Sequence, residues 1–291
     1  MGTRWSVAVV APPPGLHAAI AAVLAQIIAQ MSHWDPGSQL SRINAAAPGR
    51  WHGIAPEFAA VMAVALDIAA RSDGAFDPAL GALVDLWGFG PPGPRADTPE
   101  DSAVDAARAA TGPGAIAFDP LLLRLRRVRG ARLDLSGIAK GYAVDAVAAR
   151  LRAMGCSDFL VEIGGELVGA GIQPDGQPWW VDVEAPPGVA LAPLRIALHG
   201  MAVATSGDYR RSSAAGSHSI DPRTGRPIAH GTASVTVIHA DCCHADAWAS
   251  ALTVLEPEAA MALAEREGLA VQLVVRGWGE WLSSGLKAML D

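Results

Sequence analysis

Hydrophobic and polar positions alternate with two different periods along this chain, which predicts helices and strands mixed over its whole length. Apolar residues recur with helical spacing in five segments, and a cap-like Thr98-Pro99-Glu100-Asp101 sequence predicts the start of a sixth helix. The five helical segments are 18–31, 56–71, 137–154, 243–255 and 257–266. Strand-like runs occur at 6–10, 115–119, 121–127, 132–135, 158–163, 179–184, 194–198, 234–239 and 269–275.

This order of elements predicts an α+β fold. The loops rich in proline and glycine, such as 91–94 and 186–188, are too short to separate independent domains. We therefore expect residues 1–291 to form one functional domain, built as a large part with a smaller, closely packed second part around 73–130.

Composition agrees with a well-buried globular protein, since 51% of the 291 residues are hydrophobic and only 18% are charged. The formal net charge of −7, without any run of basic residues, argues against a nucleic-acid partner. The apolar segment 16–31 contains His17, Gln26 and Gln30 and is too short to span a membrane. We expect a cytoplasmic protein in the form given, or a periplasmic or membrane-anchored one if an upstream signal was removed.

Sequence motifs exclude several ligand classes. The three cysteines, Cys156 and the adjacent Cys242 and Cys243, lack zinc-ligand spacing and favour a reducing compartment. The pair Gly164-Gly165 is not part of a G-x-G-x-x-G turn, and no Walker sequence occurs, which excludes nucleotide binding by those two folds.

Asp246 and Ser250 are the first candidate site. Four residues apart in a predicted helix, they share one face and would place a carboxylate beside a hydroxyl. Both are hard oxygen ligands, which suit magnesium better than zinc. Taken alone, so short a motif is more often a solvated helix surface, so the other segments decide its meaning.

Three further segments carry candidate chemistry. Lys140 lies on the first turn of a helix entered through glycine, where it would bind a phosphate or remain solvated. Thr205 and Ser206 would donate hydroxyls to an anion or cap the end of a strand. His218, with Asp221 three residues later, is a candidate general base, although a single histidine is more often structural.

Nine segments together resemble one known family, the ApbE family. Most of them are long enough to be specific, and they occur in the family's order nearly from end to end. They are M-G-T at 1–3, W-D-P-G-S-Q-L-S-R-I-N at 34–44, D-G-A-F-D-P at 73–78, L-W-G-F-G at 86–90, D-L-S-G-I-A-K-G-Y-A-V-D at 134–145, V-E-I-G-G-E-L at 161–167, A-T-S-G-D-Y-R at 204–210, S-H-S-I-D-P-R-T-G at 217–225 and A-D-A-W-A-S-A-L at 245–252.

The resemblance implies an ApbE-like fold, which is related to the T-fold, and an activity. Members of the family are FAD:protein FMN transferases, which use Mg²⁺ to move FMN from FAD onto a threonine or serine hydroxyl of a protein with a D-G-x-[ST]-G-A-T-like segment. FAD is then the substrate and AMP the second product. The sequence leaves open which protein is modified and whether the chain forms a homodimer.

The resemblance also assigns roles to individual residues. Asp246 would be catalytic as a metal ligand, and Trp34 would stack on a ring of FAD. His218 is our own candidate for the catalytic base that accepts the proton of the acceptor hydroxyl, because an imidazole suits a base at neutral pH. Ser250 stands where the family usually has threonine, and Ala249 where it sometimes has an acid, which predicts a weaker metal site. The implied metal ligands are Gly137, Asp246, Ala249 and Ser250. The implied FAD contacts are Met1, Trp34, Ala75, Phe76, Asp77, Asp134, Lys140, Thr205, Ser206, Gly207 and Ile220.

Two alternative functions remain at this stage. Water could replace the acceptor hydroxyl in the same site, which would make the protein an FAD pyrophosphatase that yields FMN and AMP. A protein that binds or stores FAD without turnover is the second alternative, and the departures at Ala249 and Ser250 keep it open.

Overall fold

The structure, a computed structural model, describes residues 2–209, 212–213 and 216–290. The chain divides into two compact units. We call the unit formed by 2–26, 138–209 and 230–291 the sheet unit, and the unit formed by 27–137 and 210–229 the helical unit. Met1 lies outside the described residues, so its predicted contact with FAD stays a prediction.

The sheet unit is built on a seven-stranded sheet in the order β1-β5-β6-β9-β14-β15-β16, and all of its pairs are antiparallel. Every residue of β15 is buried, as are all residues of β14 except the last, which follows from their near-continuous runs of apolar and β-branched residues. The strands are β1 (Trp5–Val9), β5 (Phe159–Ile163), β6 (Glu166–Ala170), β9 (Met201–Gly207), β14 (Thr232–His239), β15 (Ala270–Val275) and β16 (Gly279–Leu282).

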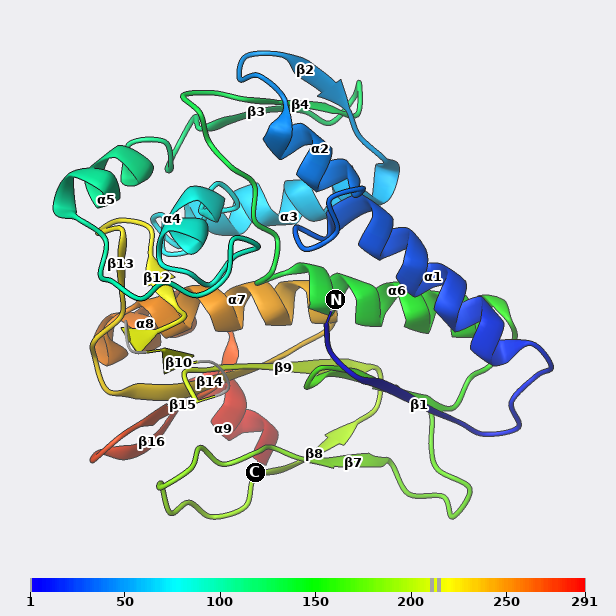
Figure 1. The fold of residues 1–291 in the computed structure, drawn as a ribbon. Helices are drawn as coiled ribbons and strands as arrows, with labels where there is room; N and C mark the ends of the chain where they lie inside the picture. Colours follow the sequence, from blue (N-terminus) through cyan, green and yellow to red (C-terminus); the bar gives the residue numbers. More distant parts are fainter. Residues whose placement is uncertain (1, 210–211, 214–215, 291) are drawn as a thin grey trace. The chain divides into compact units, whose positions relative to one another are not determined.

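Helices cover this sheet on both faces (Figure 1). Two of them, α6 (Ala139–Ala153) and α7 (Cys242–Val254), pack on each other and on β5, β6, β9 and β14. On the other face lie α9 (Ser284–Leu290) and the hairpin of β7 (Trp179–Asp182) and β8 (Arg195–Leu198). A hydrophobic cluster fills that face, with Trp179, Leu198 and Leu286 among its members.

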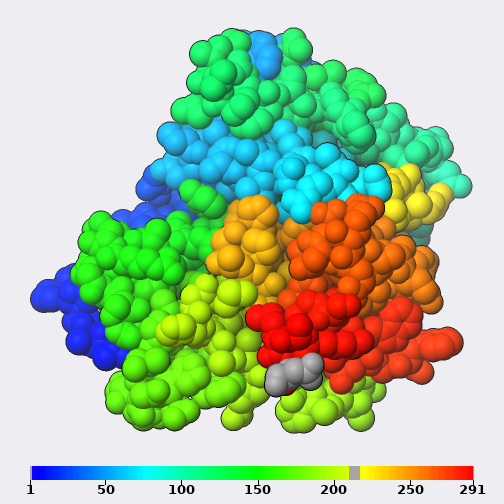
Figure 2. All heavy atoms as spheres, turned by 180° about the vertical axis from the view of Figure 1, so that it is seen from behind, coloured from blue at the N-terminus to red at the C-terminus, as the bar shows by residue number. Residues whose placement is uncertain are grey.

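The C-terminal segments of the sheet unit lie side by side when viewed from behind (Figure 2). There the orange segment that carries α8 (Pro257–Arg266) borders the red segment with β16 and α9. The carboxylate of Glu265 accepts a hydrogen bond of 2.8 Å from the backbone N–H of Ser284, which ties the end of α8 to the start of α9.

The helical unit combines four helices with small sheets. Its core under α4 and α5 contains Leu83, Trp87, Val104 and Ile220. The helices are α2 (Gln39–Ala45), α3 (Pro56–Arg71), α4 (Gly81–Leu86) and α5 (Asp101–Arg108), while α1 (Leu16–Met31) is divided between the units at Gln26. The strands are β2 (Trp51–Gly53), β3 (Ile116–Asp119), β4 (Arg124–Arg127), β10 (Ser212–Ser213), β11 (Gly216–Ser217), β12 (Ile220–Asp221) and β13 (Arg226–Pro227).

The six predicted helices are all present, and the predicted bounds of α3 and α8 match the structure. Both helices begin with proline, carry glutamate in the first turn and end with arginine, so local signals fix their ends. Among the described residues, no helix combines the length and the apolar composition that a membrane span requires. The mixture of helices with antiparallel sheets confirms the α+β prediction.

The prediction of a strand at 132–135 was wrong, because this segment forms only an isolated bridge between Leu80 and Arg132. A side chain takes the place of a neighbouring strand here. The Asn44 amide donates to the carbonyl of Leu133 at 2.9 Å and accepts from its N–H at 2.8 Å. The backbone of the segment is therefore satisfied without a ladder, and Asp134 is held beside a cavity instead.

Gly164 and Gly165 serve a turn. They connect β5 to β6 with φ angles of 70° and 104°, and Ile163 pairs with Glu166 across the two-residue loop. A two-residue hairpin of this kind needs positive φ at both central positions, which glycine adopts without strain. The turn sets the position of Glu166, the first residue of β6.

Candidate functional site

Helices α6 and α7 touch at Gly141. A side chain at this position would collide with the carbonyl of Cys242 and with Cβ of Asp246, so only glycine permits this approach. The backbone N–H of Gly141 donates to Oδ2 of Asp246 at 2.9 Å. The K-G pair at 140–141 thus brings two motifs together that are more than 100 residues apart in sequence.

Lys140, which is 30% exposed, and the buried carboxylates of Glu166 and Asp246 form a charge cluster, which we call the carboxylate cluster. The Lys140 Nζ lies 2.5 Å from Oε1 of Glu166 and 3.2 Å from Oδ1 of Asp246. Burial lowers the pKa of Lys140, but Asp246 and Glu166 outweigh it and raise that pKa overall. Burial raises the pKa of Glu166 to about 7, against the opposing effect of Lys140 and with a further contribution from Asp246. Lys140 is therefore paired with two carboxylates, although its side chain is partly exposed.

Hydroxyl groups line the neighbouring strands and helix. The Ser250 Oγ lies 3.4 Å from Oγ of Ser206, and Oγ1 of Thr205 lies 2.9 Å from Oγ1 of Thr236. Ser206 and Thr205 are near the end of β9, which packs against α7. The structure thus places Ser206 beside Ser250 of α7, while Thr205, the next residue along β9, faces Thr236 of β14. Gly207 ends β9 and pairs with Ser234 of β14.

The carboxylate cluster suits a bound cation. Two carboxylates that are each 3% exposed share one lysine, so the fully ionised cluster carries an uncompensated negative charge. Oε2 of Glu166 is also buried without a hydrogen-bond partner. Such a cluster is stabilised by further positive charge, and its oxygen donors suit magnesium.

Ala249 fits a ligand role less well than Asp246 and Ser250. It lies inside α7, and its carbonyl already accepts a hydrogen bond of 2.7 Å from Oγ1 of Thr253. Gly137 belongs to the helical unit, two residues before α6 begins. The ligand roles of these two backbone oxygens stay predictions.

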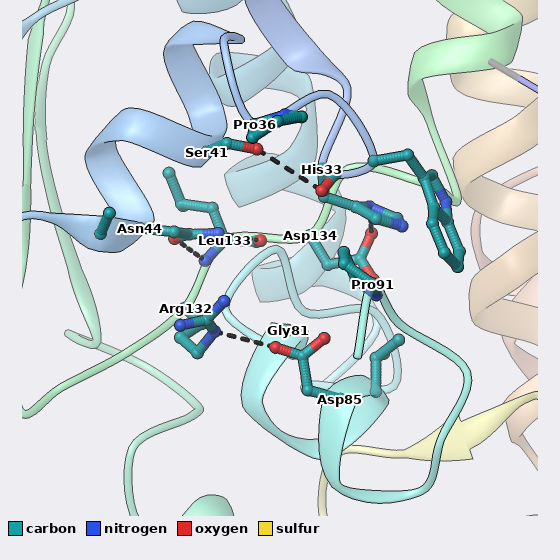
Figure 3. A pocket seen from close by; sticks show the side chains of 13 residues that line it. His33, Pro36, Ser41, Asn44, Gly81, Asp85, Pro91, Arg132, Leu133 and Asp134 are labelled. Carbon is teal, nitrogen blue, oxygen red and sulfur yellow. Dashed lines mark hydrogen bonds and ion pairs between the residues drawn. The ribbon is translucent and has the colours of Figure 1, made fainter. Parts of the chain in front are cut away.

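The helical unit contains a cavity of about 380 Å³ (Figure 3). This volume falls within the range of small-molecule sites. Its walls combine aromatic, amide and charged groups, and Trp34 on its lining is half exposed. The polar and aromatic lining residues are His33, Trp34, Ser41, Asn44, Asp85, Arg132 and Asp134. The cavity therefore offers a stacking surface beside hydrogen-bonding groups.

Asp134 is the most deeply buried acid of this cavity. Its Oδ1 lies 3.3 Å from Nδ1 of His33 and accepts from the backbone N–H of Ser136 at 2.7 Å. Burial raises the pKa of Asp134, but the contacts with His33 and Ser136 outweigh it and hold that pKa below its ordinary value. On the opposite wall, Nε of Arg132 forms an ion pair with Oδ2 of Asp85 at 3.0 Å (Figure 3).

The contact of Asp134 with His33 predicts that the protein loses stability in acid. Because the pKa of Asp134 in the folded protein is below the ordinary value of 3.8, its contribution is complete above that pH and disappears as the pH falls through the folded value. In urea unfolding from about pH 6 to pH 3, we expect the free energy of unfolding of Asp134→Asn to fall less steeply than that of the wild type. Parallel curves for the two proteins would contradict this.

The predicted FAD contacts at 75–77 are more buried than a ligand surface requires. The side chains of Ala75 and Phe76 are 2% and 7% exposed. The Asp77 carboxylate accepts from the backbone N–H of Ala79 and of Gly112, both at 2.7 Å. Burial raises the pKa of Asp77 against these two hydrogen bonds. The D-G-A-F-D-P segment thus builds a turn, and its ligand role stays a prediction.

His218 and Ile220 lie in the same part of the helical unit as α4. The imidazole of His218 meets the ring of Phe89 edge-on, with centroids 6.4 Å apart. Ile220 packs in the core beside Trp87, whose indole N–H donates to the carbonyl of Gly225. Any contact of Ile220 with a ligand would therefore involve its backbone.

Asp221 pairs with an arginine. Its Oδ1 lies 2.9 Å from Nε of Arg223, and its Oδ2 lies 2.8 Å from Nη2 of the same residue. This bidentate pairing fixes the turn that follows His218. Asp221 is therefore first a partner of Arg223, which the sequence spacing with His218 did not indicate.

Sequence reasoning gave no role to two acids of the matched motifs, Glu166 and Asp145. Asp145 lies on α6 and accepts from the backbone N–H groups of Cys242 and Cys243, at 2.9 and 2.8 Å. Burial raises the pKa of Asp145 to about 6, although both hydrogen bonds lower it. It caps α7 from a neighbouring helix. The sequence indicated Asp145 only by its place at the end of the D-L-S-G-I-A-K-G-Y-A-V-D segment. It could not show that the carboxylate contacts the start of α7.

Comparison with known proteins supports one family. The ApbE family model matches residues 1–273. A FAD:protein FMN transferase from Klebsiella pneumoniae is 35% identical over 305 residues, covering 100% of this chain and 87% of the relative. The flavin transferase ApbE from Vibrio cholerae has a TM-score of 0.91 at 34% identity and covers 99% of this chain and 96% of its own. The apo flavinyl transferase ApbE from Pseudomonas stutzeri has a TM-score of 0.88 at 38% identity, covering 98% and 96%.

The chain belongs to the ApbE family. The resemblance and the ApbE-like fold predicted from the sequence are confirmed. The relatives from Klebsiella pneumoniae and Vibrio cholerae are both named FAD:protein FMN transferases, which are transferases by class.

Proposed function

We propose that this chain is a FAD:protein FMN transferase, which moves FMN from FAD onto a threonine or serine hydroxyl of an acceptor protein and releases AMP. Full-length similarity to relatives with this name supports the proposal. The observation that carries it is the carboxylate cluster, because three motifs of the family converge there on Lys140, Glu166 and Asp246.

The proposed reaction exchanges one phosphorus–oxygen bond for another. The acceptor hydroxyl oxygen attacks the phosphorus on the FMN side of the pyrophosphate, and the bond from this phosphorus to the AMP oxygen breaks. The hydroxyl proton passes to a base, and AMP leaves with the electron pair. Charge repulsion between the nucleophile and the phosphates is the main obstacle, so positive groups near the pyrophosphate are needed.

We propose that Asp246 and Ser250 hold Mg²⁺, together with backbone oxygens for which Gly137 and Ala249 remain the candidates. A bound magnesium ion would supply positive charge to the phosphates of FAD. Lys140 would balance the carboxylates and add a further positive group. The cavity beside Trp34 and Asp134 is proposed to bind a ring of FAD, while Thr205, Ser206 and Gly207 remain candidates for phosphate contacts.

One assay separates the proposal from its two alternatives. The pure chain is incubated with FAD and Mg²⁺, with and without a peptide that contains a D-G-x-[ST]-G-A-T-like segment, and AMP is measured. A transferase releases AMP only with the peptide, and the peptide gains the mass of FMN. AMP without the peptide would instead indicate a pyrophosphatase, and no AMP in either case would indicate an FAD-binding protein.

His218 is proposed to accept the proton of the acceptor hydroxyl. Replacement of His218 by Asn removes this base, so we expect kcat to fall by about 10²–10⁴-fold. FAD affinity, measured by quenching of tryptophan fluorescence, should stay within about twofold because the base is not needed for binding. An unchanged kcat, or an equal loss of FAD affinity and turnover, would contradict this role.

Ser250 is proposed as a metal ligand through its hydroxyl. We expect Ser250→Ala to raise the Mg²⁺ concentration required for half-maximal activity by about tenfold or more. Ser250→Thr keeps the oxygen and restricts χ1, so it should need no more Mg²⁺ than the wild type. Equal Mg²⁺ requirements for Ser250→Ala and the wild type would remove Ser250 from the ligand set.

A further inference from the structure

A second group of potential metal ligands lies at the start of α7, on residues to which the family resemblance assigns no role. His239 ends β14, Asp241 is the N-cap of α7, and His244 lies in the first turn of that helix. One ligand atom from each residue lies within 4.8 Å of the others. Among the described residues, this is the one group of three histidine, cysteine or acidic side chains with such spacing.

We propose that His239, Asp241 and His244 form a binding site for a divalent transition-metal ion of the zinc class. This site goes beyond the proposed FMN transfer and shares no residue with the proposed magnesium ligands. Two imidazoles and one carboxylate are a common ligand set for zinc, and they leave at least one coordination position for water.

The observed distances come close to what such an ion needs. The Nδ1 of His244 lies 2.7 Å from Oδ1 of Asp241, and the Nδ1 of His239 lies 3.2 Å from Oδ2. Ligand bonds of about 2.0–2.1 Å in a tetrahedral site place the ligand atoms roughly 3.3 Å apart. The two imidazoles stack with centroids 5.0 Å apart and an angle of 23° between their planes. An ion between them would replace the hydrogen bond of 3.2 Å that Nδ1 of His239 now accepts from the backbone N–H of Asp241, so this imidazole would have to rotate.

The three residues are held by rigid elements and remain accessible. Asp241 accepts the backbone N–H of His244 at 2.9 Å, so its carboxylate is oriented as the cap of α7. The side chains of His239, His244 and Asp241 are between 29% and 40% exposed, which allows an ion to enter from solvent. The Asp145 carboxylate beneath the first turn of α7 adds further negative charge next to Asp241.

The neighbouring thiols are poor competitors for the ion. Cys242 and Cys243 are buried, and burial, with the nearby carboxylates, raises the pKa of both thiols well above the ordinary value. Metal binding requires the thiolate form. The cysteine spacing argued against a zinc site. That argument did not include His239 and His244, which the tertiary structure brings together with Asp241.

The test is a calorimetric titration of the chelator-treated full chain with ZnSO₄ in the presence of excess Mg²⁺. We expect one strong Zn²⁺ equivalent in the wild type. Asp241→Asn retains a side-chain cap for α7 but removes the charge, and His239→Ala removes one imidazole. Both should weaken Zn²⁺ binding by at least about tenfold. His199→Ala, which changes an exposed histidine of the same unit, should leave it unchanged.

Cobalt provides an independent spectroscopic reading. Co²⁺ bound by imidazole and carboxylate should give visible bands that disappear in His239→Ala, without the charge-transfer band of a thiolate ligand. Melting temperatures measured without metal identify any variant that fails to fold. If His239→Ala fails to fold, the comparison of Asp241→Asn with the wild type still tests the proposal. Equal Zn²⁺ binding by the wild type and Asp241→Asn, absence of binding by the wild type, or a thiolate band would overturn the proposal.

Discussion

Replacement of Asp246 by Asn is expected to lower kcat/KM for FMN transfer by about 10³-fold or more. The change removes the one negative ligand of the proposed magnesium ion, and metal stabilisation of transferring phosphates is worth several kcal/mol. The Asn side chain keeps an oxygen that can accept from the N–H of Gly141, so the contact between α6 and α7 should persist. The measurement is peptide flavinylation at saturating Mg²⁺, followed by mass spectrometry.

Asp241→Asn is the matched control for this prediction. It makes the same substitution at the N-cap of the same helix, outside the proposed magnesium ligands. We expect Asp241→Asn to retain transferase activity within a fewfold of the wild type in zinc-free buffer. Full activity of Asp246→Asn would show that the carboxylate is not required and would remove the magnesium site as proposed.

Replacement of Lys140 by Met is expected to lower the free energy of unfolding by about 3–5 kcal/mol, more than any other substitution proposed for this chain. The change leaves the buried carboxylates of Glu166 and Asp246 without their shared cation. One of them must then be desolvated while charged or take up a proton, and either costs free energy. Urea unfolding at pH 8, above the pKa of about 7 of Glu166, measures the effect without Mg²⁺.

A second substitution tests whether charge is the cause. In Lys140→Met with Glu166→Gln, only one buried carboxylate remains, and Asp246 keeps its hydrogen bond from Gly141. We therefore expect the double variant to be more stable than Lys140→Met alone, which is a coupling between neighbours. If the double variant loses the sum of the two single effects, packing of the lysine side chain, and not charge, explains the loss.

The sequence by itself determined the elements with strong local signals. Proline at the first turn and arginine at the last fix α3 and α8, and continuous β-branched and apolar runs specify β14 and β15. The family was also readable, because its long motifs occur in order along the chain. The sequence also indicated some of the positions where glycine is required. It did not show that Gly141 is required because α6 and α7 touch there.

The tertiary structure decided which side chains meet. The pairing of Lys140 with Glu166 and Asp246 depends on a hairpin turn at Gly164 and on a close contact between two helices. The segment at 132–135 looked like a strand because its own pattern is apolar and alternating, yet Asn44, far away in sequence, satisfies its backbone. Hydrogen bonds and burial between distant residues leave no local pattern, since each partner alone has an ordinary sequence. The charge clusters around Asp246 and Asp241 therefore became visible only once the chain was folded.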